Sequence, residues 1–195
     1  MEIVRAENAG FCFGVNNAVK TAFTLASERK DKPIYTYGPL IHNSAVIKKL
    51  EEKGVHSIEN VEEADLEGAE VIIRAHGVSP EIIKLLESKN AIITDATCPF
   101  VKKIHNLVRK EYEKGNKIII AGDKTHPEVI GINGWCNDTA YIVDSVEECL
   151  EISDSGDTYS VVAQTTYNEN KFADISAVCK NSFDKCIIFD TTCNA

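Results

Sequence analysis

The sequence predicts an α/β fold with mainly parallel sheets, and three observations lead to this prediction. Short apolar runs rich in β-branched residues alternate along the chain with segments that have helical apolar periodicity. The connections between these segments are short, as in parallel strands joined by helical crossovers. Cysteine recurs between a strand and a helix at positions 12, 98 and 193, which are 86 and 95 residues apart. This recurrence indicates repeated α/β units.

Each expected strand is an apolar run, and most of these runs are bounded by Gly, Asp or Asn. The strands are predicted at residues 2–6, 33–37, 71–75, 91–95, 117–121, 141–144, 159–163 and 186–190. Helices are predicted between them at residues 15–28, 43–53, 80–89, 99–114, 126–135, 146–152 and 168–181. Ser79 before Pro80 is typical of an N-cap followed by proline at the first helical position.

Composition and charge limit the class of protein. The chain has 195 residues, enough for one large domain or two of about 100 residues each. A net charge of −9 argues against a general nucleic-acid binder, which needs a basic face. The negative net charge does not exclude a small anionic ligand, because histidines and helix N-termini can bind an anion locally. No apolar stretch approaches the roughly 20 residues that span a bilayer, and the N-terminus lacks a signal-peptide pattern, so we expect a cytoplasmic protein without membrane partners.

Cysteine usage points to metal or cluster chemistry. Seven cysteines, an odd number without a secretion signal, do not fit a disulfide framework. A helix N-terminus favours the thiolate form, which is the form that binds iron or zinc. Three converging thiolates would hold a [4Fe–4S] cluster and leave one iron open to substrate. Inert burial is the alternative for the repeated cysteines, and it is preferred for Cys136, Cys149, Cys179 and Cys186.

Three of the five histidines, His42, His76 and His126, lie in turns at expected strand-to-helix junctions. Imidazole N–H groups there can donate to phosphate oxygens, and helix N-termini add backbone donors. The alternative is that all three are exposed loop residues. His56 is expected on the surface, and His105 in a structural role on the helix after Cys98.

Glu128 and Thr165 are the remaining candidates for chemistry. Glu128 begins a predicted helix, where its carboxyl could relay protons to a substrate hydroxyl. Its alternative role is to stabilise the helix dipole, worth about 0.3–1 kcal/mol. Thr165 and Thr166 follow the predicted strand 159–163, and they could position a hydroxyl or cap the next helix.

Taken together, these residues resemble the LytB family of 4-hydroxy-3-methylbut-2-enyl diphosphate reductases. Each matching segment is short, but all of them occur in the family's order across nearly the whole chain. The segments are 10–15 (GFCFGV), 41–43 (IHN), 75–78 (AHGV), 95–99 (DATCP), 125–129 (THPEV), 164–166 (QTT) and 192–193 (TC).

The resemblance implies a reductive dehydroxylation. The substrate would take up two electrons and two protons and give isopentenyl and dimethylallyl diphosphates, the final step of the non-mevalonate pathway. Electrons would come from a ferredoxin or a flavodoxin. The implied roles are [4Fe–4S] ligation by Cys12, Cys98 and Cys193, substrate binding by His42, His76, His126 and Thr165, with the first two histidines on the diphosphate, and proton delivery by Glu128.

The resemblance also implies a domain organisation. Family members are longer and form three α/β units in a pseudo-threefold arrangement around the cluster. We therefore expect an N-terminal strand segment at 1–13 that packs with the third unit, one unit at 14–97, a second at 98–191, and the start of a truncated third unit at 192–195. Two alternatives remain open: an inactive, cluster-free α/β fragment, and a structural zinc module held by Cys and His.

Overall fold

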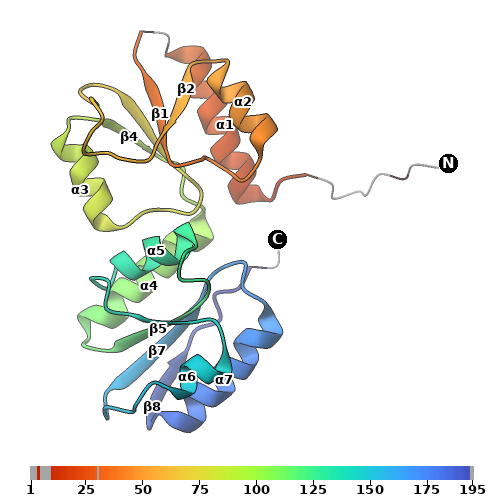
Figure 1. Ribbon diagram of the computed structural model, residues 1–195, viewed down its shortest axis with the longest axis vertical. Coiled ribbons are helices and arrows are strands. Elements are labelled where there is room, and N and C mark those ends of the chain that lie inside the picture. Colours follow the sequence, from red (N-terminus) through yellow and green to blue (C-terminus); the bar gives the residue numbers. More distant parts are fainter. Residues whose placement is uncertain (1–3, 5–9, 30, 194–195) are drawn as a thin grey trace.

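The computed structural model describes residues 4, 10–29 and 31–193, and it contains two four-stranded parallel sheets (Figure 1). The first sheet is made of β1 (Ile34–Tyr37), β2 (Val55–Ile58), β3 (Glu70–Ile73) and β4 (Ile92–Asp95). It is accompanied by helices α1 (Phe13–Glu28), α2 (Ser44–Glu51) and α3 (Pro80–Ser88). The predicted α/β class with parallel sheets is confirmed.

The second sheet repeats the plan of the first. Its strands are β5 (Lys117–Ala121), β6 (Tyr141–Val143), β7 (Thr158–Ala163) and β8 (Lys185–Ile188). Its helices are α4 (Pro99–Glu113), α5 (Pro127–Gly134), α6 (Val146–Leu150) and α7 (Glu169–Ser182). The strand order is β2-β1-β3-β4 in the first sheet and β6-β5-β7-β8 in the second, so the two sheets have the same topology.

This shared order decides where a ligand site can form. In the first sheet β2 pairs on one side of β1 and β3 pairs on the other, and in the second sheet β6 and β7 flank β5 in the same way. The direction in which strands are added therefore reverses between β1 and β3 and between β5 and β7, and these two places are the topological switch points. Ligands of open α/β sheets bind outside the carboxyl ends of the strands at such points. A ligand site is therefore expected in the loops after these four strands.

Both sheets are covered on their two faces, which explains their apolar strands. In β5, Ile118 and Ile120 pack with residues of α4 and α5, whereas Ile119 and Ala121 pack with residues of α6 and α7. In β3, neighbouring residues likewise enter different clusters, one with α1 and α2 and the other with α3. Alternate residues of a strand thus enter separate cores.

The strands and helices predicted within the described residues all occur, with bounds shifted by a few residues at most. Strand β2 was missed. Only Val55 of this edge strand is buried, while His56 and Ser57 are exposed, so the segment lacks an apolar run. The strand predicted at 2–6 lies, except for Val4, outside the described residues. Among the helices of the described part, none is both long and apolar enough to cross a membrane.

His105 packs at the contact between the two halves of the chain, as its predicted structural role requires, but its buried Nε2 has no hydrogen-bond partner within the protein, so the expected satisfied histidine is only partly found. Its buried ring stacks on Trp135 with the ring centroids 5.3 Å apart, and Trp135 Nε1 donates to the carbonyl of Val78 at 3.1 Å. Gly77 has a φ of 72°, and a Cβ there would overlap the His105 ring. Burial lowers the pKa of His105 to about 4, so the folded protein keeps this imidazole neutral.

Acid is therefore expected to destabilise the fold through His105. Between pH 6.5 and about 4 the unfolded chain binds a proton on His105 that the folded protein does not. The contribution of His105 to the free energy of unfolding is fully present above pH 6.5 and falls by roughly 3 kcal/mol over this range. Urea unfolding followed by circular dichroism at pH 7 and pH 4.5 measures this loss. The loss should be smaller in His105→Gln than in the unchanged protein, whereas the exposed His56→Gln serves as the control. Equal losses in all three proteins would contradict the assignment.

Candidate functional site

Three histidines from both sheets meet at the carboxyl ends of the strands. His42 follows β1, His76 follows β3 and His126 follows β5. The ring centroids of His76 lie 5.3 Å from those of both His42 and His126, and the other two rings are 6.3 Å apart. The sequence placed each histidine in a strand-to-helix turn, and the structure brings all three together.

Local sequence explains how two of these turns are held. Asn43 is the N-cap of α2, and its side chain accepts a hydrogen bond from the Val46 amide at 3.1 Å. His126 is itself the N-cap of α5, where its Nδ1 accepts from the Glu128 amide at 3.2 Å. Pro127 occupies the first turn of α5, where a missing amide proton costs nothing. His126 therefore keeps its Nε2 for the pocket.

The surroundings of His76 and His126 favour the neutral form of both imidazoles. Burial, and then the charge of Arg74, lower the pKa of His76 to about 4. Burial and the neighbouring His42 lower the pKa of His126. The Nδ1 atom of His76 is buried and has no hydrogen-bond partner within the protein. An unsatisfied buried nitrogen is costly, so this atom marks a place for an external partner.

Arg74 is a residue of the site that the sequence reasoning missed. Its guanidinium lies 5.8 Å from the ring centroid of Tyr37, and Gly38, at a φ of 66°, leaves room for it because a Cβ there would overlap Nη1. Burial lowers the pKa of Arg74, but arginine stays charged in proteins. The available signal was the position of this cation at the end of β3, two residues before His76.

A cavity of about 240 Å³ opens beside two of the histidines. Its walls combine the apolar side chains of Phe11, Val15 and Ile41 with His42 and His76. A pocket with one apolar wall and one polar wall suits a ligand that has both a hydrocarbon part and an anionic part.

Glu128 and Thr165 form a buried pair next to this cluster. The Thr165 amide donates to Glu128 Oε1 at 2.6 Å, and the Thr165 hydroxyl donates to Oε2 at 2.8 Å. Glu128 is only 2% exposed, and burial raises the pKa of its carboxyl against the opposing effect of these two hydrogen bonds. The pair joins the start of α5 to the end of β7, across the switch point of the second sheet.

Cys98 and Cys193 lie in the loops after β4 and β8, and Cys12 follows Phe11, which lines the histidine pocket. Cys12 and Cys98 are the N-cap residues of α1 and α4, and neither side chain makes a capping hydrogen bond. A Cβ on Gly14 would lie 2.6 Å from the Cys98 sulfur, so that thiol rests against the first turn of α1. The Cys193 amide donates to the Thr165 carbonyl at 2.7 Å, which ties its backbone to the Glu128 pair.

Three thiols are the donor set that a [4Fe–4S] cluster with one open iron uses. All seven cysteines are free thiols, and the three at the strand ends are exposed or half-buried. Within the described residues they do not come together as a single-ion site; the histidines alone do so. A cluster binds each thiolate through a different iron, so its ligands lie farther apart than those of one ion. Cys136, Cys149 and Cys179 are completely buried, as the inert structural role predicted for them requires, whereas Cys186 is half-buried.

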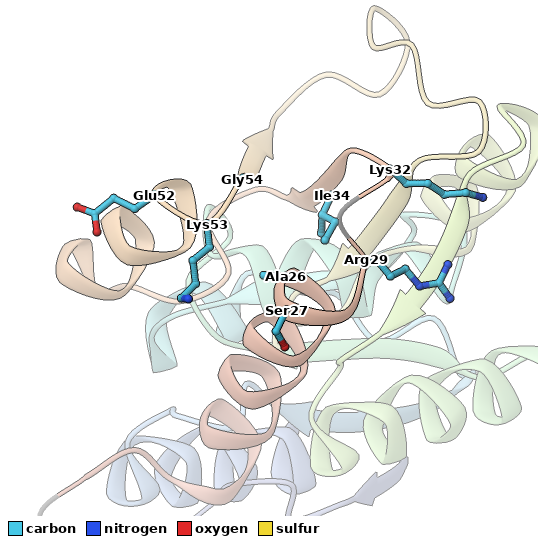
Figure 2. A pocket seen from close by; sticks show the side chains of 8 residues that line it. All are labelled: Ala26, Ser27, Arg29, Lys32, Ile34, Glu52, Lys53 and Gly54. Carbon is cyan, nitrogen blue, oxygen red and sulfur yellow. The ribbon is translucent and has the colours of Figure 1, made fainter.

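A larger pocket of about 480 Å³ lies elsewhere and shows no convergent chemistry (Figure 2). It borders Ile34 at the amino end of β1, whereas His42 follows the carboxyl end of that strand. Of its basic side chains, Arg29 and Lys32 extend to one side and Lys53 points away from them (Figure 2). Arg29 is also paired with the buried Glu70 at 3.3 Å. This pocket therefore does not compete with the histidine cluster as a candidate site.

Comparison with known proteins agrees with this picture. The sequence profile of the LytB family, described as LytB protein, matches residues 3–195. A 4-hydroxy-3-methylbut-2-enyl diphosphate reductase from Caldanaerobacter subterraneus is 50% identical over all of this chain and 68% of its own length. A reductase of the same name from Clostridioides difficile is 42% identical, with 100% of this chain and 70% of the relative covered.

Solved structures resemble the fold closely. The reductase from Plasmodium falciparum superposes with a TM-score of 0.88 at 33% identity, covering 97% of this chain and 60% of that one. A second reductase, described as the terminal enzyme of the non-mevalonate pathway, gives a TM-score of 0.84 at 37% identity, covering 98% of this chain and 68% of the other. The chain thus spans about two thirds of the length of these relatives.

The fold and the site define an α/β protein with two parallel sheets whose strand ends meet at a histidine-lined pocket. The chain belongs to the LytB family, whose members matched here are named as reductases.

Proposed function

We propose that the natural protein containing this chain is a 4-hydroxy-3-methylbut-2-enyl diphosphate reductase that gives isopentenyl and dimethylallyl diphosphates. The principal support is one juxtaposition: three histidines converge, and one of them, His126, contacts the amide of Glu128 in the buried Glu128–Thr165 pair, with free thiols in the neighbouring loops. Family membership supports the same substrate, because the matched relatives carry this name.

In this proposal the histidine side of the pocket holds the diphosphate. Each imidazole offers an N–H group to a phosphate oxygen, and Arg74 adds a fixed positive charge near His76. The capped N-terminus of α2, beside His42, adds a partial positive charge. The apolar wall with Phe11 and Val15 would receive the hydrocarbon part. These contacts orient the substrate with its hydroxyl toward Thr165.

Glu128 would supply protons to the hydroxyl. Its burial raises the pKa of the carboxyl, which favours a form able to donate. The Thr165 hydroxyl lies 2.8 Å from Glu128 Oε2 and can pass a proton onward while exchanging its own. In the overall reaction the C–O bond breaks, two electrons and two protons enter, and the hydroxyl leaves as water.

Cys12, Cys98 and Cys193 would hold a [4Fe–4S] cluster at this point. When bound, the cluster supplies electrons and Lewis-acid polarisation of the substrate oxygen. A ferredoxin or flavodoxin would deliver the electrons, and neither nucleic acid nor a membrane takes part. We place the cellular site in the cytoplasm.

The domain boundaries also stay part of the proposal. Residues 14–97 and 98–191 would form two units, and 192–195 would begin a third. Segment 1–13 would pack on that third unit. Such packing would account for the exposed Phe11 and Phe13 beside Cys12.

The test is purification of the natural protein without oxygen, followed by iron and sulfide analysis and an assay with the allylic diphosphate and a chemical reductant. We expect a brown protein that consumes the substrate and forms both products. A colourless zinc protein would favour a structural metal module. A cluster-loaded protein without turnover would refute the reductase activity.

A further inference from the structure

We propose that His42, His76 and His126 also form a binding site for one divalent transition-metal ion, best matched by Zn²⁺, when no anion occupies the pocket. Each histidine offers one nitrogen, and the three nitrogens all lie within 4.8 Å of one another. The metal site rests on this geometry alone. Its consequence for regulation, that Zn²⁺ competes with the diphosphate, rests on the proposed function.

The distances need only a small adjustment to bind an ion. Zn–N bonds of about 2.0–2.1 Å in a tetrahedron bring the ligand nitrogens to roughly 3.4 Å from one another. His42 is exposed, so its ring can move inward by a rotamer change without opening the core. His76 and His126 are half-buried and provide the fixed part of the site. The three nitrogens therefore lie close to the positions that a bound metal requires.

Neighbouring contacts set the starting state of two of the ligands. The Glu128 amide donates to His126 Nδ1, so the neutral ring carries its proton on Nε2. Binding of a metal at Nε2 therefore breaks this hydrogen bond and moves the proton to Nδ1, which costs part of the affinity. His76 has a buried Nδ1 without a protein partner. Neutral imidazole is the form that binds metals.

Neighbouring charges both oppose and favour the binding of a cation at the three histidines. The Arg74 guanidinium, whose charge lowers the pKa of both His76 and His126, weakens the attraction of any cation. The Glu128 carboxyl at the start of α5 opposes this effect when it is ionised. Three neutral nitrogen ligands on one ion leave a fourth position for water, as in catalytic zinc sites. Zinc bound there would occupy the nitrogens and the space that the diphosphate needs.

The thiols at the strand ends also bind zinc, so the experiment must separate the two ligand types. Co²⁺ is the probe, because thiolate ligands give an intense near-ultraviolet charge-transfer band that nitrogen ligands do not give. We expect the cluster-loaded natural protein, whose cysteine ligands are occupied, to bind one equivalent of Co²⁺ or Zn²⁺ in equilibrium dialysis. The difference spectrum with Co²⁺ should lack the thiolate band.

Substitutions of single histidines test which of them bind the metal. His42→Ala, at an exposed position that the fold tolerates, should weaken binding at least tenfold, and His126→Ala should do the same. His56→Ala, an exposed histidine on β2, is the matched control and should bind as the unchanged protein does. Binding of no metal, binding unaffected in His42→Ala, or a thiolate band alone would overturn the proposal. Turnover of the metal-free enzyme is measured separately, so a failed metal site leaves the reductase activity intact and the reverse also holds.

Discussion

Cys98→Ser is expected to abolish iron–sulfur binding and to reduce turnover to background. A serine hydroxyl is a poor substitute for the thiolate that iron requires. Changes in the second shell alone cost about 10–100-fold in metal affinity, so loss of one of three ligands is expected to cost more. The measurements are iron and sulfide per chain after anaerobic reconstitution, the visible absorption of the cluster, and the rate with the allylic diphosphate.

Cys186→Ser is the matched control for this substitution. Cys186 is a half-buried free thiol on β8, away from the strand ends at which the three repeated cysteines lie. It should keep normal cluster content and turnover. Normal cluster content in Cys98→Ser would remove Cys98 from the ligand set. Loss of the cluster in both variants would point to a general fault of folding.

The elements of this fold were largely predictable because strong local patterns define them. Strand β5, for example, is a run of Ile and Ala between polar residues, and its neighbours have similar runs. Strand β2 was not predictable in this way, since an edge strand with one buried residue has no apolar period. Strand β2 is positioned by its pairing with β1, and the local residue pattern of β2 does not reveal this pairing.

The same difference between local and tertiary signals decides which residues of the candidate site could be predicted. The turns that carry the histidines and the Cys–helix junctions could be recognised locally, because Gly, Pro and Asn mark them. The meeting of His126 with His42 and His76 depends on how the second sheet sits on the first. Arg74 escaped notice for a related reason. Its importance comes from Tyr37 and Gly38 on a neighbouring strand, and only the folded chain brings them to it.

Glu128 shows what a structure adds to a residue with two plausible roles. By sequence it was either a proton donor or a stabiliser of the α5 dipole. The carboxyl lies in the first turn of α5, as the second role requires. It is also buried and bonded twice to Thr165, beside the histidine pocket, and a simple dipole effect requires neither contact.

Glu128→Gln is expected to keep the cluster and to slow turnover by about 10²–10⁴-fold, the usual contribution of a positioned acid. The fold should tolerate it, because the amide oxygen can still accept from the Thr165 N–H group and the amide nitrogen can donate to the Thr165 hydroxyl. Only the transferable proton is lost.

Glu81→Gln makes the decisive comparison, since Glu81 is an exposed acid in the first turn of α3. It removes a helix-dipole interaction of the same kind, worth about 0.3–1 kcal/mol of stability, without touching the pocket. If Glu128 acts as a proton donor, the two variants differ by orders of magnitude in turnover while both retain iron. If Glu128 only stabilises α5, both variants turn over at the unchanged rate and both lose a small amount of stability in urea unfolding.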